Sequence, residues 1–161
     1  MKTVIVYYSL EGFTKKWAEE ISKQTGSDLL ALHPVKAYPD SGAKKFLWGG
    51  KSALMGDKPK LQPYVFNADK YDRVIFAYPV WASSLTPPIR SFVSENKDAL
   101  GGKEIGAIVT YMGSGAQKSI KKLEKLLNVE IKPQLILTDL DEKKEENEQL
   151  AADFIRKLSD D

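Results

Sequence analysis

Five short runs of apolar, β-branched and aromatic residues alternate along this chain with segments of helical spacing, and this alternation restricts the folds that it can adopt. The runs cover residues 3–8, 28–32, 73–78, 105–111 and 134–138. Turn residues bound the runs, and the first, third and fourth are almost continuously apolar. Such runs are typical of parallel strands that are covered on both faces. We therefore predict five strands in one sheet.

The segments between the runs place apolar residues on one side of a helix. These stripes are Phe13, Trp17 and Ile21; Ile89, Phe92 and Val93; Ile120, Leu123 and Leu127; and Leu150, Ala151, Phe154, Ile155 and Leu158. Thr86 is the predicted N-cap of the second helix, because two prolines follow it in the first turn. The last helix has a polar start at Asp141 and Glu142. Four helices are thus predicted from spacing.

Strands and helices in this order predict an α/β fold, a doubly wound parallel sheet of order 2-1-3-4-5 with helices on both faces. No linker divides residues 1–161, so a single domain is expected. Residues 35–70 interrupt the pattern, and a structureless loop of that length is unusual in a compact domain. We therefore predict a short helix over residues 41–55 that serves as the second crossover.

The composition excludes several kinds of chemistry. The chain has no cysteine, so it can form no disulfide, thiolate nucleophile or Cys-ligated metal cluster. With His33 as its one histidine, a histidine metal site or a Ser-His-Asp triad has little support, and no metal is expected. Redox chemistry in this chain would require a bound cofactor.

The charge pattern is mild. The net charge is +2 and gives no reason to expect a nucleic acid, and no segment reaches membrane-spanning length, so no membrane partner is expected either. Residues 36–60 hold six lysines against two aspartates, and residues 139–148 are mostly acidic. Solvated surface is the favoured interpretation of both segments. The protein is expected to be cytoplasmic.

The loops at the carboxyl ends of the strands are the expected ligand site, because open α/β sheets bind ligands there. Residues 9–14 follow the first run, and a helix begins at once. Free amides at a helix start, Gly12 and the hydroxyls of Ser9 and Thr14 suit a phosphate. The segment has neither a Walker A ending nor a Gly-x-Gly-x-x-Gly pattern. The alternative is an ordinary turn in which Ser9 or Thr14 caps the helix.

Two further loops follow the third and fourth runs. Trp81 could offer a rigid face on which a planar ligand stacks, or it could belong to the core. The loop at residues 111–116 contains Gly113 and Gly115, and its backbone is suited to hydrogen bonds with the edge of a ring.

Taken together, these loops resemble those of the flavodoxin family. Residues 9–14 are similar to the FMN phosphate loop, residues 79–84 to the loop beside the isoalloxazine ring, and residues 112–116 to the third contact loop. Residues 46–51, 58–64, 79–81 and 87–90 resemble small bacterial members, so the likeness covers nearly the whole chain. It implies a flavodoxin-like fold, noncovalent FMN and no catalytic side chain. The implied FMN-binding residues are Ser9, Leu10, Gly12, Phe13, Thr14, Pro79, Val80, Trp81, Ala82, Ser83, Met112, Gly113, Ser114, Gly115 and Ala116.

The chain departs from the family pattern in three ways. Glu11 stands where a hydroxyl residue is usual, and its carboxylate would repel a phosphate unless it turned outward. Ala82 stands where many flavodoxins have glycine, and a non-glycine residue disfavours a positive φ. Electron-carrier flavodoxins are commonly very acidic, and this chain is not. Lys15 and Lys16 could face the phosphate or be solvated.

The resemblance implies electron transfer with FMN, to a redox partner protein or a small electron acceptor. The alternative is an NAD(P)H-dependent quinone or flavin reductase that keeps FMN bound. A third hypothesis is an interaction domain that does not bind the cofactor.

Overall fold

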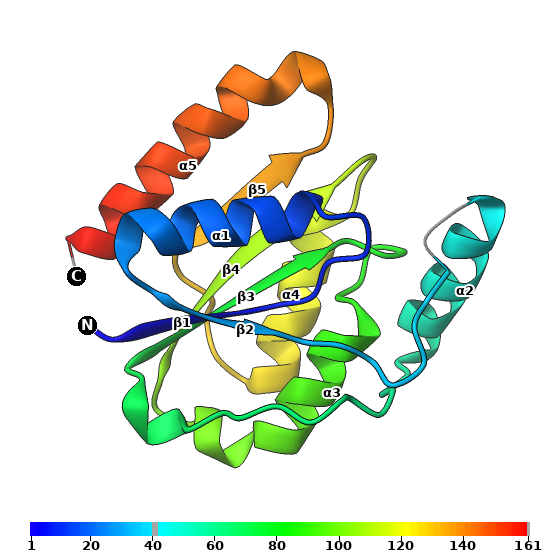
Figure 1. Ribbon diagram of the computed structural model, residues 1–161, viewed down its shortest axis with the longest axis horizontal. Coiled ribbons are helices and arrows are strands. Elements are labelled where there is room, and N and C mark those ends of the chain that lie inside the picture. Colours follow the sequence, from blue (N-terminus) through cyan, green and yellow to red (C-terminus); the bar gives the residue numbers. More distant parts are fainter. Residues whose placement is uncertain (40–41, 161) are drawn as a thin grey trace.

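The computed structural model describes residues 1–39 and 42–160 and contains a five-stranded parallel sheet (Figure 1). The strands are β1 (Thr3–Tyr7), β2 (Asp28–Ala31), β3 (Arg73–Pro79), β4 (Glu104–Tyr111) and β5 (Gln134–Thr138). Their order is β2-β1-β3-β4-β5, and each neighbouring pair is parallel. This confirms the predicted fold, with strand ends within one residue of those expected.

Four helices cover the two faces of the sheet (Figure 1). They are α1 (Phe13–Thr25), α3 (Pro87–Asn96), α4 (Ala116–Leu127) and α5 (Lys144–Ser159). Helices α1 and α5 pack on one face, with Trp17, Ile21 and Phe154 buried there. Helices α3 and α4 pack on the other face, with Phe92 and Ile120 buried. The residues of the predicted apolar stripes face the sheet, apart from Leu150 of α5, which is 40% exposed.

The starts of α3 and α5 have details that the sequence did not predict. Thr86 is the N-cap of α3 as predicted, but its side chain makes no capping hydrogen bond, and its hydroxyl is buried without a partner. Residues Asp141–Lys143 form a separate 3-10 turn, and α5 begins at Lys144. Two prolines at the start of α3 have no amide N–H, so the first turn offers fewer donors to a capping hydroxyl.

Helix α2 (Gly42–Met55) differs in position from the expected crossover helix. It lies beyond the carboxyl ends of the strands and does not cross a face of the sheet (Figure 1). The chain returns to β3 through residues 57–71, where Leu61 is buried in the core and Tyr64 and Phe66 contact the ring of Phe92. This segment supplies the cover that a second crossover helix would give. Residue 41 of the predicted helix lies outside the described residues.

The strand register brings three loops to one edge of the sheet. Tyr7 of β1 is opposite Ala77 of β3, and Pro79 of β3 is opposite Thr110 of β4. The loops after β1, β3 and β4 therefore leave the sheet side by side. In the part of the chain that the structure describes, no helix combines the length and the apolar character needed to cross a membrane.

Candidate functional site

The loop after β1 forms a donor-rich helix start. Gly12 is the N-cap of α1 and has φ 97°, a left-handed conformation that favours glycine. The amide of Gly12 donates to Ser9 Oγ at 3.1 Å, so Ser9 closes the loop and does not cap the helix. Within the described residues, the amides of Phe13 and Thr14 donate no hydrogen bond. They are available to an anion, together with the positive end of the helix dipole.

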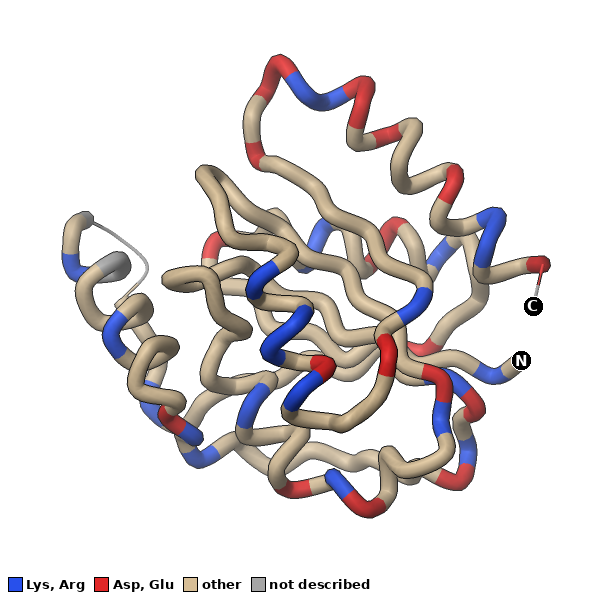
Figure 2. The backbone as a smooth tube through the Cα atoms, turned by 180° about the vertical axis from the view of Figure 1, so that it is seen from behind, with Lys and Arg blue, Asp and Glu red and all other residues tan. Residues whose placement is uncertain are grey.

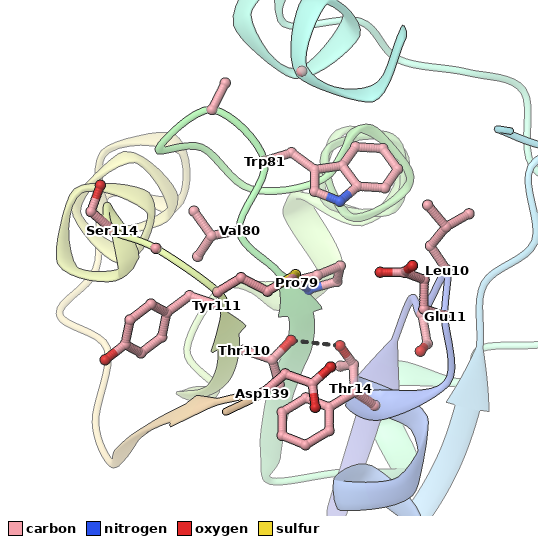
Figure 3. A pocket seen from close by; sticks show the side chains of 16 residues that line it. Leu10, Glu11, Thr14, Pro79, Val80, Trp81, Thr110, Tyr111, Ser114 and Asp139 are labelled. Atoms are coloured by element: carbon pink, nitrogen blue, oxygen red, sulfur yellow. Dashed lines mark hydrogen bonds between the residues drawn. The ribbon is translucent and has the colours of Figure 1, made fainter. Parts of the chain in front are cut away.

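Thr14 is buried and pairs with a second threonine on a different element. Its Oγ1 lies 2.7 Å from Thr110 Oγ1 at the end of β4, and both residues line the same cavity (Figure 3). One hydroxyl of the pair donates to the other, which leaves one O–H for a ligand. The pair thus joins the α1 start to β4 and keeps a donor at the cavity wall.

Neither of the two lysines near this helix start is among the residues that line the cavity. Lys15 Nζ lies 3.7 Å from a carboxylate oxygen of Glu19, one turn along α1. Lys16 Nζ lies 5.8 Å from the ring of Trp17. Of the two interpretations, the structure favours solvated lysines, so amides and hydroxyls supply the polar contacts at this loop.

Trp81, in the loop after β3, is half-buried between the core and the cavity. Its ring makes edge contacts with Tyr8 at 5.6 Å and with Tyr38 at 5.1 Å between centroids. Gly49 of α2 lies so close that a Cβ there would be 3.0 Å from Trp81 Cε3. These contacts hold the indole rigidly, while it still lines the cavity (Figure 3). Trp81 therefore packs against the core and also lines the cavity, so both interpretations of this residue hold.

A tight turn follows Trp81. The amides of Trp81 and Ser84 each donate to the other residue's carbonyl, at 3.1 and 2.9 Å. The central residues Ala82 and Ser83 have φ 50° and 54°, as in a type I′ turn. The sequence predicts that Ala82 disfavours a positive φ, yet it adopts one, at a cost of about 1–2 kcal/mol. The two turn hydrogen bonds offset that cost.

The third loop packs against this turn. Gly115 has φ 94°, and a Cβ on it would lie 2.8 Å from Ser83 Cα. Met112, Gly113 and Ser114 line the cavity. Gly115 instead sets the spacing between two loops, because only a residue without a side chain fits beside Ser83.

The loops enclose a cavity of about 380 Å³ at the carboxyl ends of the strands. Eleven of the predicted residues line it, namely Ser9, Leu10, Phe13, Thr14, Pro79, Val80, Trp81, Ala82, Met112, Gly113 and Ser114. Gly12, Ser83, Gly115 and Ala116 are not among the lining residues; they belong to the loops and helix starts that carry the lining. The structure adds Glu11, Gly50, Thr110, Tyr111 and Asp139 to the lining.

The sequence could have predicted some of these additional lining residues but not others. Thr110 and Tyr111 end a predicted strand, and Asp139 directly follows β5, so the rule that ligands bind at carboxyl ends could have included them. Gly50 has no such signal, because α2 reaches the cavity only through the tertiary fold.

Two carboxylates, those of Glu11 and Asp139, line the cavity (Figure 3). Partial burial raises the pKa of Asp139 above its ordinary value of 3.8, and the negative charges of Glu11 and Asp141 raise it further. Lys16 acts in the opposite direction. Glu11 remains at the cavity rather than outside it, so an anion bound at the α1 start would be repelled by both carboxylates.

The Asp139→Asn substitution is expected to tighten phosphate-ligand binding at pH 7. Removing one negative charge should raise FMN affinity about two- to fivefold and leave riboflavin affinity unchanged, because only FMN carries the phosphate. The gain should fade as the pH falls through the raised pKa of Asp139, where the wild-type carboxyl also becomes neutral. Fluorescence titrations between pH 4 and 8 would measure this, with Glu148→Gln on the exposed side of α5 as the control. An equal gain for riboflavin would contradict it.

The sequence profile of the Flavodoxin family matches residues 2–152. The chain belongs to the flavodoxin family. No curated protein matches it in sequence.

Solved structures share the fold of this flavodoxin-family protein. A flavoprotein from Lactobacillus acidophilus, solved in complex with FMN, is 22% identical with a TM-score of 0.72, over 91% of this chain and 98% of that one. The apo-form of the flavoprotein from Lactobacillus acidophilus is 23% identical with a TM-score of 0.64, over 88% and 93%. A flavodoxin from the domain Archaea is 17% identical with a TM-score of 0.58, over 99% of both chains. At these identities the likeness establishes the fold.

Proposed function

We propose that this flavodoxin-family chain is a cytoplasmic protein that binds FMN in the cavity and carries electrons between partners. The observation that carries the proposal is the combination, in one cavity, of unpaired helix-start amides with a rigidly held tryptophan. The first suits a phosphate and the second suits a flat ring.

The residues present fit FMN. The phosphate would be held by the amides at the start of α1 and by one hydroxyl of the Thr14–Thr110 pair. The volume of about 380 Å³ lies in the range of cofactor pockets, roughly 300–1,000 Å³. Glu11 and Asp139 weaken the electrostatic part of this fit without blocking the cavity.

The protein's own groups would bind and orient the ring. Trp81 presents a ring surface to the cavity, and edge contacts with Tyr8 and Tyr38 hold that ring in place. In the described part of the chain, the amides of Ala82 and Ser83 donate no hydrogen bond, so the tip of the turn can address a polar ring edge. FMN supplies the redox chemistry when bound, and the loops position it and exclude water.

A reductase would take its electrons from NADH or NADPH, whereas an electron carrier would not, and this difference separates the two functions. The FMN-loaded protein, reduced anaerobically by dithionite, is expected to reduce two molecules of cytochrome c per FMN. It should oxidise NADH or NADPH no faster than an equal concentration of free FMN, with or without benzoquinone. Rapid NAD(P)H oxidation would support the reductase. Failure to take up FMN would overturn both functions and leave the interaction domain.

The Trp81→Ala substitution should weaken FMN binding by about 1–3 kcal/mol, roughly 5- to 150-fold, because the stacking surface is lost. FMN fluorescence, which the indole is expected to quench on binding, should rise in the variant. Trp48→Ala is the matched control, since Trp48 is 58% exposed and does not line the cavity. Unchanged affinity and quenching in Trp81→Ala would place the indole in the core alone.

A further inference from the structure

Helix α2 carries four large apolar residues on the outside. Leu47, Trp48, Leu54 and Met55 are 70%, 58%, 68% and 68% exposed. The helix turns small residues inward, including the buried Gly49, Ser52 and Ala53. A surface helix ordinarily does the reverse, and a large exposed apolar patch on a folded protein marks a contact surface.

The exposed residues share one side of α2, and lysines lie among them. At roughly 100° per residue, residues 47, 48, 54 and 55 fall within about a third of the helix circumference. Exposed Lys44 and Lys51 project between Leu47 and Trp48 in this wheel. We call Lys44, Leu47, Trp48, Lys51, Leu54 and Met55 the α2 face. Asp57, Lys58 and Lys60 follow the helix in the sequence, and Figure 2 shows charged positions of both signs just beyond it.

The α2 face adjoins the cavity. Gly50 lines the cavity, and Gly49 packs against Trp81 from the same helix. Met112, 58% exposed, belongs to the cavity lining as well and adds a further apolar side chain at its mouth. A protein that covers the α2 face would therefore come within a short distance of a ring stacked on Trp81.

We propose that the α2 face is the docking surface for an acidic, one-electron redox protein; this rests on the proposed FMN-dependent electron transfer. The apolar side chains would form the centre of the contact, and Lys44 and Lys51 would pair with carboxylates of the partner. Charge complementarity of this kind speeds encounter and sets orientation. The charge relation is the inverse of an acidic flavodoxin that meets basic partners.

The position of the lysines favours an acidic protein over other occupants. In a twofold dimer through the α2 face, Lys44 and Lys51 would meet the same lysines of a second copy, which is repulsive. In a lipid surface, lysines would flank the apolar stripe, whereas here they lie within it. Carboxylates of a protein partner can reach such central lysines directly.

The test measures electron transfer from a purified acidic two-iron ferredoxin to the FMN-loaded protein in a stopped-flow instrument. Each reduced ferredoxin gives up one electron, so two are oxidised for each FMN that takes up two electrons and a proton from solvent. The variants are Lys44→Glu with Lys51→Glu, and Leu47→Ser with Leu54→Ser. The control is Lys121→Glu with Lys125→Glu, which makes the same charge change on exposed positions of α4.

The wild-type rate constant should fall as salt rises, and the α2 charge reversal should lower it about tenfold or more at low salt. The serine pair should also slow the reaction, and the α4 control should not. Reduction by dithionite should be equal in all four proteins. A charge reversal that leaves the ferredoxin rate unchanged would overturn the docking proposal.

Two further measurements identify a different occupant. Binding of the wild type, but not the α2 variants, to phosphatidylglycerol vesicles with an unchanged ferredoxin rate would assign the surface to lipid. Sedimentation showing a dimer that the serine pair dissociates would assign it to a second copy. Loss of FMN uptake or of dithionite reduction would instead count against the proposed function.

Discussion

FMN is expected to bind this protein at least about a hundredfold more tightly than riboflavin. The difference arises at the start of α1, where the amides of Phe13 and Thr14 donate no hydrogen bond in the described structure. Each charge-assisted bond to a phosphate contributes about 1.5–3 kcal/mol, so two of them correspond to roughly 10²- to 10⁴-fold. Glu11 and Asp139 oppose the phosphate charge and move the expectation toward the lower figure.

Titration of the protein's tryptophan or the flavin's fluorescence with both compounds would measure this ratio. Repeating it at raised ionic strength separates the contributions, because salt weakens the phosphate's long-range attraction and leaves ring stacking unaffected. Equal affinities would show that the α1 start does not hold the phosphate. The assignment of FMN to this cavity would then rest on the Trp81 contact alone.

The Gly115→Ala substitution is expected to destabilise the protein by about 2–5 kcal/mol and to lower FMN affinity strongly. A positive φ costs alanine about 1–2 kcal/mol, and overpacking adds about 1–3 kcal/mol. The added methyl would stand 2.8 Å from Ser83 Cα, which is backbone and cannot rotate away. The 81–84 turn must move, and Trp81 moves with it. Urea unfolding and FMN titration would measure the two effects.

Gly26→Ala is the matched control for backbone strain. Gly26 has φ 70° at the end of α1, and nothing lies within 4 Å of an added Cβ. In this variant the free energy of unfolding should fall by only about 1–2 kcal/mol, the cost of a positive φ for alanine, and the FMN affinity should not change. Ser83→Gly should recover part of the Gly115→Ala loss, because it removes the opposing side chain and relieves φ 54°. Equal losses in the two alanine variants would mean that the loops adjust freely.

The strands could be predicted because a buried strand requires a continuous run of apolar residues, which is visible in the sequence. Residues 73–78 and 105–111 are almost wholly apolar, since helices cover both faces of β3 and β4. Five strands in a doubly wound sheet suit the order 2-1-3-4-5, which is the order that the structure has. The position of α2 could not be predicted in this way, because its apolar composition suits a buried helix while Leu47, Trp48, Leu54 and Met55 are exposed.

The candidate site was predictable where a loop follows a strand. The cavity gathers residues from the loops after β1, β3 and β4, as expected, and the family follows from the sequence itself. Which residues of those loops line the cavity and which only shape the loops was not predictable. Gly113 lines the cavity while Gly115 spaces two loops, although both are glycines of one short segment.

The sequence by itself determined which segments are strands, which helix faces are apolar and which loops share an edge, because periodicity and chain order encode these locally. Only the tertiary structure decided that Thr14 meets Thr110, that Gly49 abuts Trp81 and that Asp139 stands near Glu11. Each of these pairs joins residues far apart in the chain. Their distances depend on how the strands align and the loops pack, and no local pattern carries that information.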